Sequence, residues 1–296
     1  MTNRIAMRAL IGALLAGTLA PSAVNAQVVF TGTGTAGATG SLNDFRTAIG
    51  GVNNGNNPPP KATGRREINW DGVALNNTDF GGNVTVIDNN KTVGIAVNRF
   101  QARGALFEEV YAVSGDGFAS VNPGTAGQFP AFSPTKTFAM FNETSIGMSF
   151  VFASNPATAP IQAGTRGFGA IFLDVEKANS SSIEYFNGKT SLGKFFVPVG
   201  GSAEPEFLGV LFDSPIVTSV ELTVGTDVLF NFDGTNFTPG GSEDLRNGHD
   251  FAVVDDFVFA EPVQAVPEPS AYAMLGTSLL GTVGLVRRLR KKAKAV

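Results

Sequence analysis

The chain has 296 residues, of which 43% are hydrophobic and 16% are charged, with 36 Gly, 16 Pro and no Cys. So few charges beside so many glycines and prolines favour short strands joined by turns over a helical bundle or a coiled coil. The absence of cysteine excludes a disulfide framework, a zinc ribbon, a thiol nucleophile and an iron–sulfur cluster. The single histidine, His249, excludes a multi-histidine metal centre.

Residues 1–26 have the pattern of a secretory signal peptide. Arg4 and Arg8 supply a basic start, an apolar stretch follows from Ala9 to Ala20, and small residues precede a cleavage site between Ala26 and Gln27. An uncleaved N-terminal anchor is the alternative, although the apolar stretch is shorter than the roughly 20 residues that a membrane-spanning helix needs. We expect the mature protein to begin at Gln27, after export through the Sec machinery.

The C-terminal residues 267–296 form a second signal with three parts. Pro267, Glu268 and Pro269 come first, an uncharged segment runs from Ser270 to Val286, and six basic residues follow before Val296. The uncharged segment has the minimum length of a transmembrane helix, and the basic end is expected to stay on the cytoplasmic side. The body between residues 27 and 266 is then expected outside that membrane, as one domain.

This tripartite tail resembles the PEP-CTERM sorting domain of Gram-negative bacteria. The resemblance implies that an exosortase in the inner membrane processes a transiently anchored precursor. It also implies that the body goes to the cell envelope, the surface or the extracellular matrix. A permanent single-pass anchor is the alternative reading of the same residues.

The mature body is markedly acidic. Without the two basic residues of the signal peptide and the six of the tail, it has 13 Lys and Arg against 24 Asp and Glu, a net charge of about −11 compared with −4 for the whole chain. Such a charge disfavours binding to nucleic acid or to anionic lipid.

The N-terminal part of the body is rich in glycine. The low-complexity run from Thr31 to Gly40 is expected to be flexible, and one short helix is expected to follow it, capped by Ser41 or Asn43. The stretch from Gly50 to Gly64 contains three consecutive prolines and reads as an exposed loop.

The rest of the body has short β-branched and aromatic runs separated by turn residues, which is typical of strands. The ten expected strands are Thr92–Val97, Thr137–Phe141, Ile146–Phe152, Gly167–Val175, Ser182–Phe186, Lys194–Val199, Phe207–Phe212, Val217–Val224, Asp227–Phe232 and Phe251–Phe259. The expected fold is all-β, a single antiparallel β-sandwich of jelly-roll type whose core is filled by many of the 25 Phe.

The body also resembles an uncharacterised set of secreted bacterial proteins that carry the same tail. The likeness rests on three stretches: NDFRTAIGGVNNG with GRREINWDGV, GFGAIFLDVEKANSSSIEYFNG with LGKFFVPV, and FLGVLF followed by FAVVDDFVFAEP. It supports the location and the fold, and implies no activity.

Candidate metal ligands lie near the C-terminal end of the body. Asp255 and Asp256 interrupt the apolar run FAVVDDFVF, and strict alternation places Asp255 beside Phe257 and Asp256 beside Val254. Buried carboxylates need arginine, backbone N–H donors or a cation. With Asp250 and Asp244, and with Glu243 and Asn247 nearby, they are candidate calcium ligands; hydrogen-bonded structural aspartates are the alternative.

Arg65, Arg66, Trp70 and Asp71 form a candidate ligand-binding cluster, because charges and the single tryptophan meet there. The alternative is structural, with one of the arginines paired to a buried aspartate.

No catalytic motif of the common kinds is recognised: the sequence has no GxSxG around a serine, no Walker loop and no HExxH. We therefore expect a non-enzymatic exported protein that binds glycan or has a structural role in an exopolysaccharide matrix or biofilm. A secreted carboxylate-dependent glycosidase or lyase acting on matrix polysaccharide is the alternative, since it requires only two suitably spaced carboxylates.

Overall fold

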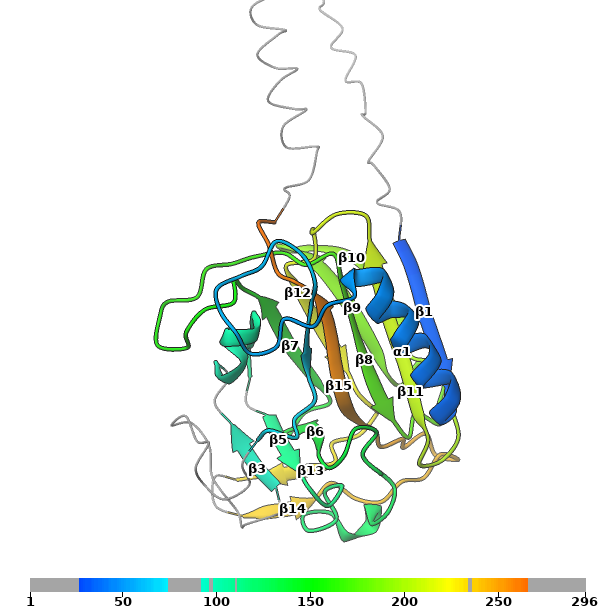
Figure 1. Ribbon diagram of the computed structural model, residues 1–296. Helices are drawn as coiled ribbons and strands as arrows, with labels where there is room; N and C mark the ends of the chain where they lie inside the picture. The colour runs from blue at the N-terminus through cyan, green and yellow to red at the C-terminus, as the bar shows by residue number, and fades with distance from the viewer. Residues whose placement is uncertain (1–26, 74–91, 96–97, 110, 234–235, 266–296) are drawn as a thin grey trace, which may run out of the picture. The chain divides into compact units, whose positions relative to one another are not determined.

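The computed structural model describes residues 27–73, 92–95, 98–109, 111–233 and 236–265, the strand at 92–95 through its backbone alone (Figure 1). The expected signal peptide and nearly all of the expected sorting tail lie outside these residues. No helix in the described part of the chain is long and apolar enough to cross a membrane.

Within the described residues, antiparallel strands form two main sheets and one small hairpin. The larger sheet has eight strands, with β2 paired to β15 beside the order β1-β11-β8-β15-β6-β5-β3, and the smaller has the order β10-β9-β12-β7-β4. The strands of the larger sheet are β1 (Gln27–Thr33), β2 (Arg65–Ile68), β3 (Thr92–Ile95), β5 (Tyr111–Ser114), β6 (Thr137–Met140), β8 (Gly167–Leu173), β11 (Pro205–Phe212) and β15 (Val253–Ala260). Those of the smaller sheet are β4 (Ala105–Phe107), β7 (Ser145–Phe150), β9 (Ser182–Asn187), β10 (Thr190–Phe196) and β12 (Ser219–Thr223), while β13 (Phe230–Phe232) and β14 (Phe237–Pro239) form the hairpin.

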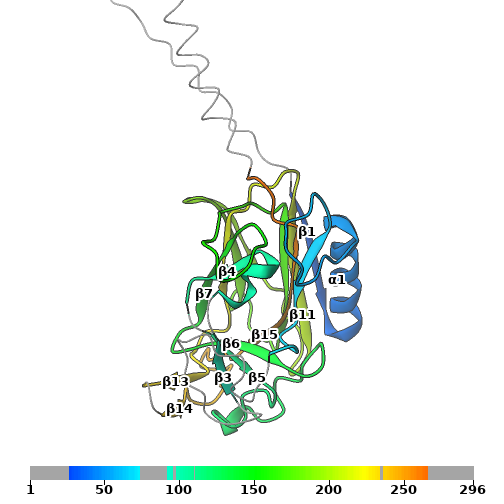
Figure 2. The same cartoon turned by 60° about the vertical axis from the view of Figure 1, so that its left-hand side comes forward.

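The two sheets pack face to face around one aromatic core. Met148 and Phe150 of β7 and Leu222 of β12 contribute to the same buried cluster as Phe168 of β8 and Phe257 of β15. Figure 2 shows the β4–β7 side and the β11–β15 side as separate layers, with α1 (Gly34–Gly50) outside the second. The expected antiparallel β-sandwich is confirmed, and its larger sheet carries a helix on the outer face.

Helix α1 corrects the expectation for the glycine-rich run. Residues 31–40 are not a flexible segment, because β1 extends to Thr33 and the helix begins at Gly34, well before Ser41. Ser41 does not cap it, since its hydroxyl donates to the Thr31 carbonyl oxygen at 2.6 Å. A Cβ on Gly32 would lie 2.2 Å from the Gly37 carbonyl oxygen, so glycine allows the helix to approach the strand closely.

Strand β15 corrects a second expectation, that of strict alternation through FAVVDDFVF. Val254 pairs with Phe172 and Phe257 with Ala170, so two residues, Asp255 and Asp256, stand opposite one residue of β8. This β-bulge brings Val254 and Phe257 into the same core cluster. On the other side, β15 pairs with β6 before the bulge and with β2 after it. Both aspartates therefore lie where one neighbouring strand replaces another.

Each of the ten expected strands corresponds to an observed strand, with ends shifted by a few residues. Residues 96 and 97 of the first lie outside the described residues. Side chains alternate along β7: Ile146, Met148 and Phe150 are buried, and the residues between them are half-buried. The loop expected at residues 50–64 has one isolated β-bridge, between Asn53 and Arg65, and is otherwise irregular.

Candidate functional site

Arg66, one of the predicted ligand-binding residues, forms a buried ion pair with Glu261. Arg66 Nε donates to Glu261 Oε2 at 2.6 Å and Nη2 donates to Oε1 at 2.8 Å. Nη1 donates to the Gly55 carbonyl oxygen at 2.8 Å, while Glu261 also accepts from the Lys61 backbone N–H. A buried charged pair needs such additional hydrogen bonds. The pairing matches the structural alternative for this residue, with a glutamate in place of the expected aspartate.

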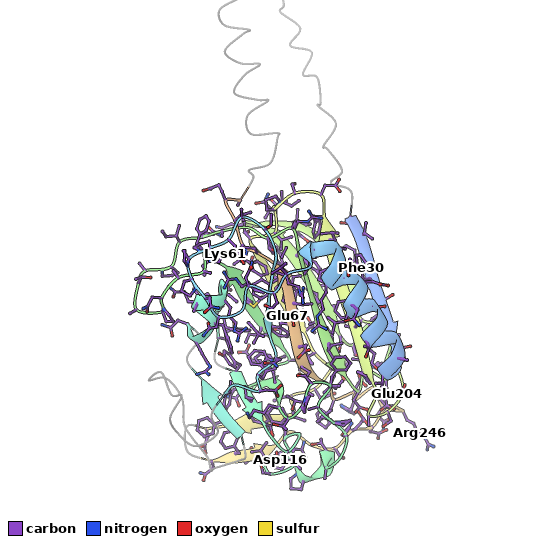
Figure 3. The ribbon with its side chains drawn as sticks, viewed as in Figure 1. Phe30, Lys61, Glu67, Asp116, Glu204 and Arg246 are labelled. Carbon is purple, nitrogen blue, oxygen red and sulfur yellow. The ribbon has the colours of Figure 1, made fainter. Side chains whose placement is uncertain are left out.

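Arg65 and Asp71 also have protein partners. Arg65 Nε donates to Glu67 Oε1 at 2.5 Å, and Glu67 receives Arg46 Nη2 at 2.9 Å on its other oxygen. Asp71 Oδ1 accepts the backbone N–H groups of Thr135 and Lys136 at 2.5 and 3.3 Å. Figure 3 labels Glu67 in front of the sheet and Lys61 on the loop beside it. The Arg46–Glu67 pair ties α1 to β2, and the Asp71 contacts tie the residues after β2 to those before β6.

Trp70, the single tryptophan of the chain, is buried in the sandwich core with 1% exposure. Its ring stacks on Phe138 at a centroid distance of 4.4 Å and contacts Phe107 and Phe257. The indole N–H donates to the Asp255 carbonyl oxygen at the bulge. The ring therefore offers no open stacking surface, and only its margin reaches a neighbouring cavity.

That cavity is a pocket of about 420 Å³. Its described lining residues combine amides, guanidinium groups and aromatic rings: Asn56, Asn69, Trp70, Gly72, Val73, Arg99, Phe100 and Arg103. Arg99 and Arg103 are the first and last residues of the short helix η1 (Arg99–Arg103). Asp71 and Arg66 are close in sequence to this lining, but the described lining contains neither residue.

The pocket has a cationic character that the acidic composition of the body does not indicate. Burial lowers the pKa of Arg103, and the neighbouring charges of Arg66 and Arg99 lower it further. Arg103 Nη1 donates to the Glu67 carbonyl oxygen at 2.6 Å, which fixes the guanidinium against β2. An anion in the pocket would relieve this repulsion between positive charges.

Asp255 and Asp256, two of the predicted metal ligands, share the hydroxyl of Ser133. Ser133 Oγ lies 3.1 Å from Asp255 Oδ1 and 2.8 Å from Asp256 Oδ1. Asp255 Oδ2 also accepts the backbone N–H groups of Phe132 and Ser133, and Asp256 Oδ2 lies 3.7 Å from Arg46 Nη2. The Ser133 hydroxyl has one proton and can donate to one of the two carboxylates at a time. A proton held by the carboxyl pair would supply the second donor.

The surroundings favour such a proton. Burial raises the pKa of Asp255 to about 8, and the adjacent charge of Asp256 acts in the same direction. Burial also raises the pKa of Asp256, against the effects of the Ser133 hydroxyl and the Arg46 charge. These contacts are those of the hydrogen-bonded structural aspartates weighed above.

A separate acidic group lies where β8 ends and β11 and β15 begin. One carboxylate oxygen from each of Asp174, Glu176 and Glu243 lies within 4.8 Å of the other two. Asp250, another predicted metal ligand, borders this group, because its carboxylate accepts the Glu176 backbone N–H at 3.2 Å. The structure places Asp255 and Asp256 at the bulge, Asp250 beside this acidic group, and Asp244 on the turn before Asp250. Calcium binding by these four residues stays a prediction.

Asp244 and His249 lie on the turn before Asp250. Asp244 Oδ2 accepts the Asn247 side-chain amide at 2.7 Å, and His249 Nδ1 lies 2.9 Å from Asp227 Oδ1. Among the hydrogen bonds of the described residues, none joins His249 to a serine.

Four charged residues are among those of these two sites that sequence reasoning missed. Arg99 and Arg103 stand close together in RFQAR, and two cations so near in sequence were a usable signal. Asp174 and Glu176 follow directly after the hydrophobic strand β8, and acidic residues at the end of a buried strand could have indicated the site.

Two comparisons with known proteins give a result. Residues 265–291 match the PEP-CTERM protein-sorting motif. Among solved structures, the chain is similar to TmCBM61 in complex with beta-1,4-galactotriose at 13% identity, over 51% of this chain and 88% of that chain, with a TM-score of 0.26. A TM-score this low supports no conclusion about ligand or function. A search of curated proteins finds no match.

The sorting motif establishes the route of the protein. The chain is an exported protein with a transient membrane-anchored stage, and it is an exosortase substrate sorted to the envelope. The expected resemblance of the tail is therefore confirmed.

Proposed function

We propose that the exported body binds acidic polysaccharide of the envelope or extracellular matrix without cleaving it. The observation that carries the proposal is the pocket of about 420 Å³ that places Arg99 and Arg103 beside the amides of Asn56 and Asn69. Guanidinium groups bind carboxylates through paired N–H donors, and amides suit sugar hydroxyls. A uronic acid residue presents both kinds of group.

The electrostatics of the pocket support an acidic ligand over a neutral one. The pKa of Arg103 is lowered by burial and by two neighbouring arginines, so a bound carboxylate gains from a partly desolvated cationic site. Phe100 adds an apolar wall, with the Arg99 guanidinium 5.6 Å from its ring centroid. This local site differs in sign from the acidic body around it.

The same lining favours binding over hydrolysis. Hydrolysis of a glycosidic bond commonly uses two carboxyl groups on either side of that bond. The described lining of the pocket contains neither Asp nor Glu. Retention in the matrix through such a site agrees with export by the sorting motif.

The experiment is affinity electrophoresis of the full-length chain in mild detergent, in gels containing polygalacturonate, alginate or neutral dextran. We expect retardation by the two acidic polymers, weakening with salt because charge pairs are screened. Arg99→Gln and Arg103→Gln are expected to weaken binding about tenfold or more, equivalent to at least about 1.4 kcal/mol.

Arg166→Gln is the matched control, because this arginine donates to the Ala48 carbonyl oxygen on an exposed part of the body. It should bind as the parent does. Equal binding by the Arg103 variant, or retardation by dextran alone, contradicts the proposal. Release of reducing ends from the acidic polymers would favour the glycosidase or lyase alternative.

A further inference from the structure

The acidic group at the end of the larger sheet has a defined position in the fold. Asp174 follows the last residue of β8, and Leu173 of that strand pairs with Pro205 of β11 and with Val253 of β15. Glu243 and Asp250 belong to the segment that leads into β15. In Figure 3, Glu204 and Arg246 are labelled in the same lower corner of the view, on the two segments that meet at this end. Distant parts of the sequence thus converge here.

Two carboxylates of this region are buried with an unpartnered oxygen. Asp174 and Asp250 are both 0% exposed. Asp174 Oδ1 accepts the Ala203 backbone N–H at 2.5 Å, whereas Asp174 Oδ2 and Asp250 Oδ2 have no hydrogen-bond partner among the described residues. Against the effect of burial, the Gln128 amide near Asp174 and the Ser180 hydroxyl near Asp250 lower the pKa of these carboxyls, but neither makes a well-formed hydrogen bond to the two Oδ2 atoms. A buried oxygen with neither donor nor cation is costly.

Lys177, the positive charge nearest in sequence, lowers the pKa of Asp250 against the larger effect of burial but forms no ion pair with the group among the described residues. Lys177 Nζ donates to the Gly248 carbonyl oxygen at 2.9 Å. No ion pair within the described part of the chain joins Asp174, Glu176 or Glu243 to Lys or Arg. The geometry gathers negative charge and leaves its compensation open.

Burial and mutual repulsion disfavour the charged forms of these carboxyl groups. Burial raises the pKa of Asp174 to about 6 and that of Glu243 to about 7, and repulsion from the neighbouring carboxylates adds to both. Burial likewise raises the pKa of the adjacent Glu206 to about 8. A divalent cation would reverse the sign of the local field and favour the charged forms.

We propose that Asp174, Glu176 and Glu243 bind a calcium ion, with Asp250 beside them as a further ligand. The available ligands are all oxygen atoms, which suits a hard cation and not zinc, which prefers nitrogen and sulfur. Calcium accepts six to eight oxygens at flexible geometry, so carboxylates from separate loops fit it better than magnesium, which requires a near-ideal octahedron. The ion would tie the segment before β15 to the end of β8, a role independent of the polysaccharide pocket.

The experiment measures thermal unfolding of the full-length chain in mild detergent, in EGTA and then with 0.1–10 mM calcium chloride or magnesium chloride, a range set by the affinities of about 10⁻⁴–10⁻³ M of extracellular calcium modules. We expect calcium to raise the unfolding temperature by several degrees, because a ligand that binds only the folded state stabilises it. Glu176→Gln and Glu243→Gln should lose most of this rise. In EGTA, both variants should unfold at or above the parent temperature, since each removes repulsion.

Glu184→Gln is the matched control: Glu184 is a half-buried glutamate of the smaller sheet, with Lys194 Nζ 3.4 Å away. It should keep the full calcium response. No rise for the parent at 10 mM calcium, or an unchanged rise in both glutamine variants, overturns the proposal. A rise as large with magnesium overturns the assignment to calcium. Polygalacturonate binding in EGTA separates this result from that of the pocket.

Discussion

Arg66 and Glu261 form a two-pronged ion pair inside the sandwich, with Nε–Oε2 and Nη2–Oε1 distances of 2.6 and 2.8 Å and at most 1% exposure of either side chain. Glu261 also accepts the Asn54 amide at 2.8 Å, and Arg66 reaches the Gly55 carbonyl oxygen. The pair thereby anchors the glycine- and proline-rich loop to β2 and to the residue after β15.

Removing one partner should be strongly destabilising. Glu261→Ala leaves a buried guanidinium without its counter-charge, and we expect it to lower the free energy of unfolding by about 3–5 kcal/mol. Urea unfolding followed by Trp70 fluorescence measures the loss. Glu184→Ala is the control, because its partner Lys194 is 43% exposed and such a pair contributes about 0–1 kcal/mol. A loss below about 1 kcal/mol for Glu261→Ala would contradict this account.

The bulge carboxyls should make stability depend on pH. Because the pKa of Asp255 rises from 3.8 to about 8 on folding, the folded state holds a proton that the unfolded chain has released. Its contribution to stability is complete below about pH 4 and is lost as the pH rises toward 8. Asp255→Asn should flatten the decline by up to about 1.4 kcal/mol per pH unit. Urea unfolding in EGTA between pH 5 and 8 tests this, and parallel curves for parent and variant would refute it.

Ser133 should matter most when both bulge carboxyls are charged. Its hydroxyl is shared between Asp255 and Asp256, so Ser133→Ala removes a hydrogen bond to a buried carboxylate, about 1.5–3 kcal/mol at pH 9, which is above the pKa of about 8 of Asp255. At pH 5 the loss should be smaller, because a protonated carboxyl supplies its own donor. Ser149→Ala is the control, since Ser149 donates to the exposed Glu108, and its effect should stay within about 0.5 kcal/mol. Equal losses at both pH values would exclude the shared proton.

Local sequence patterns were sufficient for much of the fold. Alternation predicts strand β7 and an unbroken apolar run predicts β8, and many phenylalanines do fill the core. The bulge in β15 could not be predicted from local sequence, because it lies where the neighbour of β15 on one side changes from β6 to β2. Strand β1 was missed because its pairing with β11 joins residues nearly 180 positions apart.

The candidate sites depended on contacts between distant parts of the chain even more than the strands did. Sequence reasoning placed Asp250 and Asp255 in one metal site, yet the bulge turns Asp255 toward Ser133, while the Asp250 carboxylate accepts the backbone N–H of Glu176 beyond the end of β8. Arg66 was recognised as a candidate for a buried pair, whereas Glu261 as its partner required the pairing of β2 with β15. Spacing along the chain carries no information on these encounters.

The glycine-rich start of α1 yields a paired prediction. Gly32→Ala places a Cβ 2.2 Å from the Gly37 carbonyl oxygen, so β1 and α1 must separate, at a cost of about 1–3 kcal/mol. Gly40→Ala, on the exposed face of the same helix, meets nothing within 4 Å and should stabilise the protein by about 0.5–1 kcal/mol, since alanine favours the helix. Urea unfolding of the two variants gives opposite signs if glycine serves close packing in β1 and is merely tolerated in α1. A gain from Gly32→Ala would mean that the helix does not lie against the strand as described.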